Sequence, residues 1–555
     1  MSDRDCRVVG FGDRALLVET TDVATAHALA AVLDAGVDGG RAPTGIDDVV
    51  IGFANVVVVL DPDVVDHADV VDWVAGAAEV AGAGSGTLPA GNARPARTHV
   101  LPVVFDGADL GEVAALLDVA EGRVVELMVS AELEVAFVGF APGFPYLTGL
   151  PPELAGLARR ATPRTSVPAG SVAVAAGFAS VYPRATPGGW HLLGRTAASL
   201  FDPDVPPYSR VAPGDRVRFE VDHDGLPQPA ADDDDERPLL DADGPCLVVV
   251  EPGLATTVQD AGRIGCARLG VPTAGAADPR SLALANRLVG NPAGAAGLEC
   301  TASGPVVQMV GDGLLAVVGS GPGAVDVTVA GHPMPDGVVL PVTDGQVVRI
   351  GPVGRGLRAY LAVSGGLATP VLFGSRSSDT LAGLGPGAVR AGDRLARGAP
   401  TRAHARLDWE EPVEDGPTEL RVVAGPHGWP VDGLCATTWR VGSEVDRIGM
   451  RLDATDGSVM GPGRPRASTP MVTGAVQIPP DGRPIVLLPD HATVGGYPVV
   501  ACVIAADVAR LGQLAPGAEI AFTAVDLATA QAAYARARRA DAFRVSGWFP
   551  TTAGT

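Results

Sequence analysis

Turn-forming residues constrain the fold of this chain more than any other feature of its sequence. Glycine contributes 72 and proline 48 of the 555 residues, roughly a fifth of the chain and well above ordinary usage. From residue 137 onward, short β-rich runs alternate with Pro or Gly turns about every 8–12 residues, as in a barrel or sandwich. The sequence therefore predicts a mainly β protein with α/β parts.

An acidic stretch at residues 228–245 divides the chain into two parts. Like charges repel and cannot be buried together, so we expect a solvated linker there. The first 90 residues alternate strand and helix signals, whereas the rest of each part has the turn-rich β pattern. The expected units are a small α/β domain at 1–90, a β-barrel domain at 98–227, a β domain at 246–410, a second barrel domain at 411–527, and a helix and tail at 528–555.

Three motifs of the first part recur in the second part in the same order. The first two pairs share an offset of 307 residues. Three ordered matches predict an internal duplication, with one related β domain closing each part. We expect a cleft between these two domains. The matched pairs are Thr-Pro at 162–163 and 469–470, Ala-Thr-Pro-Gly-Gly-Trp at 185–190 and Ala-Thr-Val-Gly-Gly-Tyr at 492–497, and residues 213–219 and 516–522.

The charged residues exclude several classes of function. A net charge of −23 makes nucleic acid and anionic membranes poor partners, because phosphates require a basic surface. All 41 basic residues are arginine, so the chain has no P-loop lysine, Schiff-base lysine or biotinyl-lysine. Any bound phosphate must be held by arginine, backbone N–H groups or a metal. The N-terminus lacks a signal-peptide core and no window has 18 consecutive apolar residues, so we expect a cytoplasmic protein without a membrane span.

The first part offers a set of candidate substrate-binding residues. Residues 137–149 form a strand that runs into a Pro/Gly loop, and this loop is either a ligand wall or a tight corner of a barrel. The arginines and the Gly-Gly turn are able to bind a carboxylate or phosphate, or else they are a surface cation and a β-turn. The candidates are Phe144, Tyr146, Arg164, Thr186, Gly188, Gly189, Trp190 and Arg195.

The second part offers the more reactive groups. His491 stands between an aspartate and a Gly-Gly turn, so it is either a general base near neutral pH or a hydrogen-bonded structural histidine. His427 is a weaker candidate, and no spacing predicts a metal site. The catalytic candidates are Arg447, Gln477, Asp490 and His491. The further substrate-binding candidates are Gln259, Asp260, Arg263, Arg376, Thr493, Gly495, Gly496 and Tyr497.

These segments resemble a pair of known families. The first part is similar to the B subunit of bacterial ATP-dependent 5-oxoprolinase, also called the Kip kinase-inhibitor family, and the second part is similar to the C subunit. The resemblance implies a B–C fusion with cyclophilin-like β-barrels that works with a separate A subunit. It implies ATP, with or without Mg, as the cofactor and opening of the lactam of 5-oxoproline to glutamate. The motifs that carry it are Gly139–Leu147, Ala161–Thr165, Pro187–Trp190, Val258–Asp260, Asn286–Asn291 and Gly495–Pro498.

Within that resemblance, the arginines are expected to stabilise transferred phosphoryl charge, and Asp490 and His491 to transfer protons. The sequence departs from the family pattern at Asp106–Ala108, Val129–Ser130 and Ser468–Thr469. Two alternatives stay open. One is a biotin-dependent carboxyltransferase for urea or a related amide, with biotin on another chain. The other is a non-catalytic regulator that binds a histidine kinase.

Overall fold

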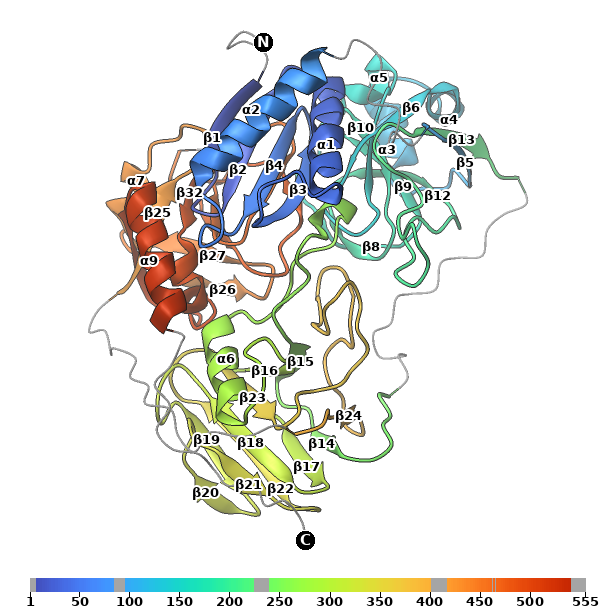
Figure 1. Ribbon diagram of the computed structural model, residues 1–555. Coiled ribbons are helices and arrows are strands. Elements are labelled where there is room, and N and C mark those ends of the chain that lie inside the picture. Colours follow the sequence, from blue (N-terminus) through green and yellow to red (C-terminus); the bar gives the residue numbers. More distant parts are fainter. Residues whose placement is uncertain are drawn as a thin grey trace.

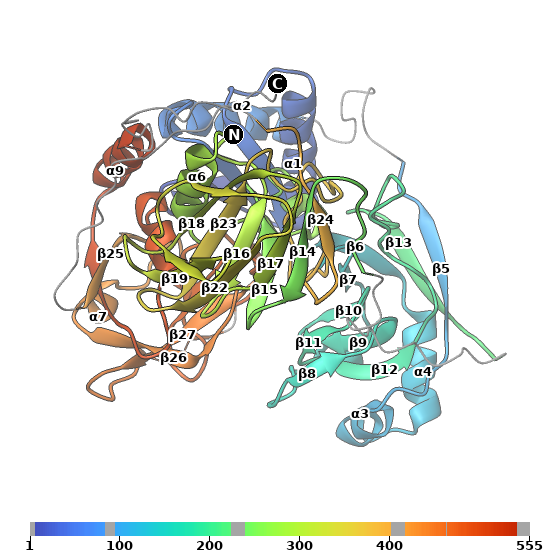
Figure 2. The same ribbon diagram turned by 90° about the horizontal axis from the view of Figure 1, so that it is seen from below.

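The structure is a computed structural model that describes residues 6–83, 95–223, 239–400 and 417–540, apart from residues 462 and 465. Most of the acidic linker and of the C-terminal tail predicted from the sequence therefore lies outside the described residues. Strands dominate the described part, as the abundance of turn residues predicted. Figures 1 and 2 show two strand-rich bodies on opposite flanks of the molecule, with further sheets between them.

The N-terminal unit is a four-stranded antiparallel sheet with order β1-β2-β4-β3. Helices α1 and α2 cover one face of this sheet (Figure 1). Strand residues alternate between the faces, so Leu16 and Val18 pack under the helices while Ala15 and Leu17 point the other way. The Asp22 side chain caps α1 by accepting the Thr25 N–H. The elements are β1 (Cys6–Gly10), β2 (Ala15–Thr20), α1 (Val23–Asp38), β3 (Ile46–Gly52), β4 (Asn55–Leu60) and α2 (His67–Ala83).

The first barrel follows, with strand order β12-β9-β10-β7-β6-β13-β5. A bridge between Val104 and Arg195 joins the two ends of this sheet. A separate two-stranded ribbon pairs β8 with β11. The elements are β5 (Thr98–Val103), α3 (Leu110–Leu117), α4 (Glu121–Ser130), β6 (Leu133–Val138), β7 (Pro145–Thr148), α5 (Pro152–Ala155), β8 (Arg164–Val167), β9 (Ser171–Ala175), β10 (Phe178–Val181), β11 (Thr186–Gly188), β12 (His191–Arg195) and β13 (Arg216–Val221).

The second barrel is closed, with order β25-β32-β29-β30-β27-β26-β33. In both barrels the last strand runs parallel to the first strand and antiparallel to the second. The ribbon pairing β28 with β31 repeats that of β8 with β11. The duplication predicted from the three motifs is therefore confirmed. The elements are β25 (Thr418–Ala424), α7 (Asp432–Cys435), β26 (Thr438–Val445), β27 (Gly449–Ala454), β28 (Thr469–Pro470), β29 (Ala475–Gln477), β30 (Ile485–Leu487), β31 (Val494–Gly495), β32 (Val499–Val503), α8 (Val508–Leu511), β33 (Glu519–Ala524) and α9 (Leu527–Ala540).

In the sequence between the two barrels, residues 246–396 form two sheets that pack around a core of valine and leucine side chains, and we call them the middle sheets. Helix α6 lies against the five-stranded sheet. The remaining elements are β14 (Cys246–Glu251), β15 (Ala255–Gln259), α6 (Pro279–Leu288), β16 (Gly297–Thr301), β17 (Val306–Val310), β18 (Gly313–Val318), β19 (Val325–Val329), β20 (His332–Met334), β21 (Leu340–Val342), β22 (Val347–Val353), β23 (Arg358–Val363) and β24 (Arg394–Ala396).

The N-terminal sheet packs on the second barrel, far away in the sequence. Ala15 and Leu17 share a buried apolar cluster with Ala475 and Val499. The Asp13 carboxylate accepts the Ala505 N–H, with the nitrogen 3.0 and 3.1 Å from its two oxygens. The two ends of the chain's folded part are thus in direct contact. The domain limits drawn from the sequence stay a prediction.

Candidate functional site

The two repeated ribbons place the Gly-Gly turns in equivalent positions beside the two barrels. Gly188 pairs with Arg164 in the first ribbon, and Gly495 pairs with Thr469 in the second. Each second glycine accepts a backbone hydrogen bond of 2.8 Å, from Arg160 to Gly189 and from Arg466 to Gly496. All four turn glycines are partly exposed, and so is Tyr497.

The first barrel touches the second ribbon directly. A Cβ atom at Gly139 would lie under 3.0 Å from the Val494 side chain, so only glycine fits there. A Cβ at Gly496 would lie 3.9 Å from Nη2 of Arg159, an exposed arginine of the first barrel. The two Gly-Gly turns therefore belong to a surface that both barrels form. We define the barrel junction as the two ribbons together with Gly139, Arg159 and Arg466.

The predicted aromatic wall is a packed cluster. Phe144, Tyr146 and Trp190 are all buried, with ring centroids 5.2 Å apart for the first pair and 5.7 Å for the second. Burial raises the pKa of Tyr146 to about 12. Tyr182 completes the cluster, and its hydroxyl lies so close to Gly188 that no larger residue fits there. A ligand-binding role for the cluster stays a prediction.

The two predicted arginines of the first barrel, Arg164 and Arg195, are engaged by carboxylates. Nη2 of Arg164 lies 2.7 Å from Asp109 and Nη1 of Arg160 lies 2.8 Å from the same oxygen. The Leu192 N–H donates to the other Asp109 oxygen at 2.7 Å. Burial opposes ionisation of Asp109, but these donors hold its pKa below the usual value. Arg195 pairs with Asp106 at 3.0 Å, on one side of the loop that holds Asp109.

Two buried threonines occupy equivalent positions in the ribbons. Thr186 and Thr493 are 3% and 2% exposed, and neither hydroxyl has a hydrogen-bond partner in the described part of the chain. Gln477 donates to the sulfur of Met471 at 3.1 Å and lies beside Gly495. These predicted residues are thus close to the barrel junction.

Arg447 and Asp490 form a buried ion pair at 2.8 Å within the second barrel. Arg447 also donates to Glu299 at 2.5 Å and to the Gly275 carbonyl at 2.6 Å. Burial disfavours the charge on Glu299, but Arg447 and Arg358 hold the pKa of that carboxyl below its usual range. The second oxygen of Asp490 accepts two hydrogen bonds from Thr380. Catalytic roles for Arg447 and Asp490 stay predictions, and their contacts are those of an anchor.

Arg263 and Asp379 are two further buried charges close to the Arg447–Asp490 pair. Arg263 is 1% exposed and donates to the Ser377 carbonyl, yet its Nε and Nη1 have no partner among the described residues. One oxygen of Asp379 is likewise buried and unpartnered among those residues. Burial, with the negative charge of Asp490, raises the pKa of Asp379 to about 7. Sequence reasoning missed Asp379, because a single aspartate in a polar loop carries no distinguishing pattern.

The neighbouring predicted residues hold this loop in place. Asp260 accepts hydrogen bonds from the hydroxyls of Ser375 and Ser377, both at 2.6 Å, and from the Arg376 N–H at 2.7 Å. Gln259 donates to the Ser378 carbonyl at 2.9 Å. The geometry therefore brings Gln259, Asp260 and Arg263 together with the loop that carries Arg376.

Burial lowers the pKa of both candidate histidines. In His491, Nδ1 lies 2.9 Å from the Ala492 carbonyl, and burial lowers the pKa. In His427, Nδ1 lies 2.9 Å from the Val499 nitrogen. Burial and the charge of Arg466 lower the pKa of His427 to about 4.

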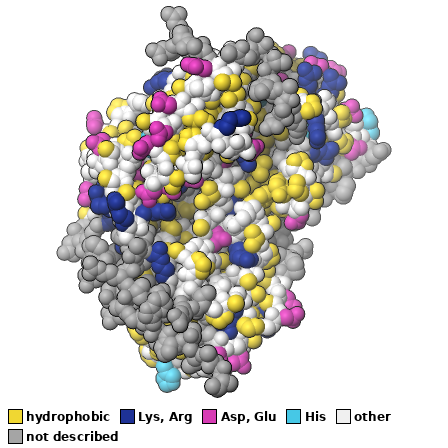
Figure 3. Space-filling view, in the orientation of Figure 1, with side chains coloured by type: hydrophobic (Ala, Val, Ile, Leu, Met, Phe, Trp, Pro, Cys, Tyr) yellow, Lys and Arg dark blue, Asp and Glu magenta, His cyan; other side chains and the backbone are white. Residues whose placement is uncertain are grey.

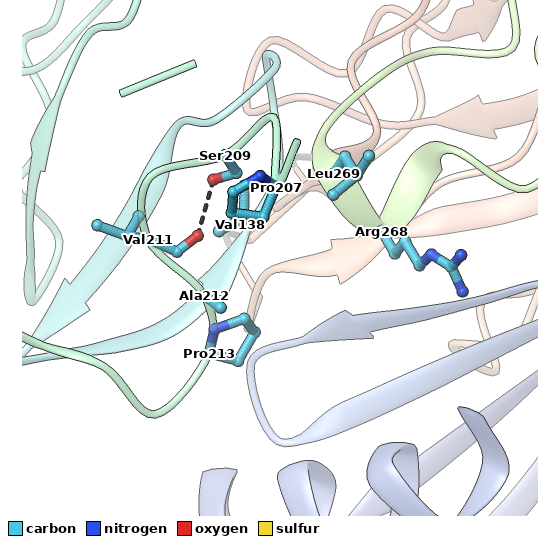
Figure 4. Close-up of a pocket in the computed structure, with 8 residues that line it drawn as sticks. All are labelled: Val138, Pro207, Ser209, Val211, Ala212, Pro213, Arg268 and Leu269. Atoms are coloured by element: carbon cyan, nitrogen blue, oxygen red, sulfur yellow. Dashed lines mark hydrogen bonds between the residues drawn. The ribbon is translucent and has the colours of Figure 1, made fainter. Parts of the chain in front are cut away.

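Metal sites and cavities are the remaining places where a ligand could bind. Among the residues that the structure describes, no group of three or more His, Cys, Asp or Glu could hold a metal ion. A cavity of about 200 Å³ lies where the first barrel meets Leu269 (Figure 4). It is lined by prolines, valines and one serine whose hydroxyl donates to Val211, and Arg268 points away from it. None of the predicted site residues lines this cavity.

On the face in Figure 3, acidic and basic side chains intermingle, and neither sign forms a single patch. No helix among the described residues is sufficiently long and apolar to span a bilayer.

The comparisons with known proteins agree with this architecture. The family model for carboxyltransferase domain subdomains C and D matches residues 6–211, and the model for subdomains A and B matches residues 269–524. The chain therefore belongs to the carboxyltransferase-domain family. Within it, the chain is a fusion of a part like the B subunit of 5-oxoprolinase and a part like the C subunit of that enzyme.

The 5-oxoprolinase C subunit from Escherichia coli K12 is 33% identical over 295 residues, which are 51% of this chain and 92% of that protein. The B subunit from Escherichia coli O157:H7 is 50% identical over 129 residues, 23% of this chain and 59% of that protein. A crystal structure of the protein TTHA0988 has a TM-score of 0.79 and 34% identity, and it covers 92% of this chain and 99% of its own. A urea amidolyase from Lachancea kluyveri is 31% identical, but this chain spans only 17% of it.

Proposed function

We propose that this chain is the B–C component of an ATP-dependent 5-oxoprolinase, which opens the lactam of 5-oxo-L-proline to L-glutamate together with a separate protein like the A subunit. One observation carries the proposal: two parts of a single chain match two subunits of the same enzyme, and the match covers 92% of the C subunit. The proposed location is the cytoplasm, where all six cysteines would stay reduced.

The barrel junction supplies the chemistry that such a reaction requires. A lactam resists hydrolysis, and transfer of a phosphoryl group to its carbonyl oxygen activates it. Oxygen atoms that gain negative charge need fixed donors and cations around them. Arg159 and Arg466 are exposed there beside the Gly-Gly turns, and Arg164 keeps one buried N–H group without a partner among the described residues. These arginines are the groups of this chain that fit a phosphate, whereas the chain has no lysine to do so.

Ring opening also requires proton transfer. Water adds to the activated carbonyl carbon, the carbon–nitrogen bond breaks, phosphate leaves, and the ring nitrogen takes up a proton to become the amine of glutamate. His491 is the predicted residue for this transfer, and Asp490 beside it positions Arg447. ATP binds either to this chain or to its partner protein, and nucleotide binding measured on each protein alone distinguishes the two.

The decisive experiment compares three preparations: this chain, a protein like the A subunit, and both together. Glutamate and ADP formation from 5-oxoproline and ATP is measured in each. We expect turnover that requires both proteins, with equal amounts of glutamate and ADP. Arg159→Met and Arg466→Met are expected to lower turnover, whereas Arg349→Met, at an exposed pair on the middle sheet, serves as the matched control. Absence of turnover with both proteins present would contradict the proposal.

The similarity to urea amidolyase supports a second candidate, a biotin-dependent carboxyltransferase for urea or a related amide. Biotin would then be carried by another chain, because a biotinyl carrier needs a lysine. In the same assay, turnover that requires bicarbonate and a biotinylated carrier would favour this candidate over the first.

A further inference from the structure

The two barrels hold one backbone N–H group in the same way but with different side chains. Gly107 in the first barrel donates to the Leu193 carbonyl, and Gly425 in the second donates to the Val500 carbonyl. Two residues after each glycine, a side chain accepts a backbone N–H: Asp109 from Leu192 and His427 from Val499. The two carbonyl acceptors, Leu193 and Val500, are 307 residues apart, and so are the two N–H donors, Leu192 and Val499. This is the offset of the ribbon motifs. Asp109 and His427 are therefore equivalent positions.

The hydrogen bond from Val499 fixes the state of the His427 ring. Because Nδ1 accepts a hydrogen bond from an N–H group, it has no proton of its own. The neutral ring then carries its proton on Nε2. A proton on Nδ1 would point at the Val499 N–H, whose nitrogen lies only 2.9 Å away. The positive charge of Arg466 also disfavours a charged ring. Burial acts in the same direction, and the pKa of about 4 is consistent with a ring that stays neutral.

The donor on the other side of the ring is free. Nε2 has no hydrogen-bond partner in the part of the chain that the structure describes. It is not fully buried, so solvent reaches it. Val499 begins strand β32, directly after the Gly-Gly turn of the second ribbon. Arg466 also meets that turn, through its hydrogen bond to Gly496. The Nε2–H group is thus a preorganised donor beside the second ribbon of the barrel junction.

We propose that His427 is a permanently neutral hydrogen-bond donor that binds the carbonyl oxygen of a small amide substrate at the barrel junction. This inference rests on the proposed function, in which the substrate is a lactam. Nε2–H donates to the carbonyl oxygen and stabilises the negative charge that grows there, while Arg466 supplies the nearby positive charge. His427 does not act as a base, because the Val499 N–H already occupies its lone pair.

The first barrel cannot perform this role at the equivalent position. Asp109 is an acceptor without a proton to donate, and Arg160 and Arg164 already bind it. The duplication has therefore produced one barrel with a carboxylate at this position and one with a neutral donor. The proposal assigns amide recognition to the second.

Two substitutions separate the proposed donor role of Nε2 from the structural role of Nδ1, which accepts the Val499 N–H. His427→Asn keeps an oxygen that accepts the Val499 N–H but removes the Nε2 donor. We expect a folded protein with an unchanged melting temperature and turnover lowered by about 10²–10³-fold, mainly in kcat. His427→Gln restores an N–H group near the Nε2 position and should recover part of that loss. His332→Gln, at an exposed histidine of β20, is the matched control and should behave as wild type. Full turnover by His427→Asn would overturn the proposal.

A second measurement does not depend on turnover. In protein with isotope-labelled histidine, the His427 ring signals, assigned by their loss in His427→Asn, should report the neutral Nε2–H form between about pH 5.5 and 8. 5-Oxoproline should shift the Nε2 signal, and proline, which lacks the lactam carbonyl, should not. A protonated ring or the Nδ1–H form would overturn the proposal.

The two measurements also distinguish its failure from failure of the proposed function. If 5-oxoprolinase turnover is absent but urea shifts the Nε2 signal, the proposed function is wrong and the donor role stands. If turnover is present but neither amide moves the signal, the donor role is wrong.

Discussion

The two barrels have the same strand order but differ at the side chains that face the barrel junction. Strand pairing closes the second barrel, and a single bridge joins the same ends of the first. Both use a glycine and an acceptor two residues later to hold the loop after the first strand against β12 or β32. Strand register determines the backbone positions, because a one-residue shift would move every core side chain to the other face. The acceptor side chain is under no such constraint, and Asp109 and His427 differ in charge and in donor capacity. Duplication thus conserved the backbone of the two barrels, while the side chains at this equivalent position diverged.

The barrels also differ in how they are attached to the middle sheets. The second barrel is attached through the buried charges of Arg447, Asp490 and Glu299. The contacts of the first barrel with the middle sheets include a backbone hydrogen bond of 3.1 Å from Gly143 to Leu269 and a hydrogen bond from Arg184 to the Leu381 carbonyl. Attachment by buried charge is strong only while every partner is present.

The largest effect should come from removing the central cation of that attachment. Arg447→Met leaves Asp490 buried without its ion-pair partner and leaves Glu299 with Arg358 alone, so the free energy of unfolding should fall by about 3–5 kcal/mol. Urea denaturation followed by circular dichroism measures this. A loss below about 1 kcal/mol would show that the buried pair does not hold the barrel.

A matched pair of substitutions tests the equivalence of the two loops. A Cβ at Gly107 or at Gly425 would lie under 3.0 Å from backbone atoms of the opposite strand. Gly107→Ala and Gly425→Ala should therefore each lower the free energy of unfolding by about 1–3 kcal/mol. Gly122→Ala, in helix α4 with open space around it, should have no cost and serves as the control. A large loss at one glycine and none at the other would break the comparison.

The two halves should respond to pH in opposite directions. The pKa of Asp109 is lowered by folding, so its contribution to stability is present above about pH 4 and is lost as the pH falls below that value. The pKa of Asp379 is raised to about 7, so the unfolded chain loses this proton first and stability falls as the pH rises from about 4 to 7.

The slope for one such group is at most about 1.4 kcal/mol per pH unit. Asp379→Asn should flatten the fall toward neutral pH, and Asp109→Asn should flatten the loss in acid. Thermal melts at a series of pH values measure both slopes. A wild-type profile that Asp379→Asn leaves unchanged would refute the assignment.

The smallest effects should come from exposed ion pairs on the two barrels. Arg218 pairs with Glu132 at 3.1 Å on the first barrel, and Arg440 pairs with Glu519 at 2.8 Å on the second. Solvent screens both pairs, so Arg218→Ala and Arg440→Ala should each change the free energy of unfolding by less than about 1 kcal/mol. A larger loss on either barrel would mean that surface charge, and not the buried attachment, determines the difference.

Much of the fold could be predicted from local sequence. The alternating strand and helix signals of the first 90 residues match the order of elements β1, β2, α1, β3, β4 and α2. A helix was expected at the start of residues 528–555, and α9 covers Leu527–Ala540. The packing of the N-terminal sheet on the second barrel could not be predicted, because Asp13 and Ala505 meet across 492 positions and no local pattern encodes that contact.

The candidate site was likewise predictable from the sequence only in part. The repeated motifs correctly indicated two equivalent Gly-Gly ribbons. Asp109, Arg159 and Arg466 were missed, although the Gly-x-Asp at 107–109 and the Gly-x-His at 425–427 were a usable signal once the strands before them were aligned. Sequence alone could not show that Arg447 and Asp490 neutralise each other, since that depends on distances in three dimensions.

The seating of the N-terminal sheet on the second barrel has a consequence for assembly. Where the B-like and C-like parts are made as separate polypeptides, an equivalent contact would have to form by collision and would weaken on dilution. In this chain both partners are tethered, which corresponds to an effective concentration on the order of millimolar. The B-like and C-like parts are therefore always made in equal amounts, and the contact between them does not depend on the cellular concentration of the protein.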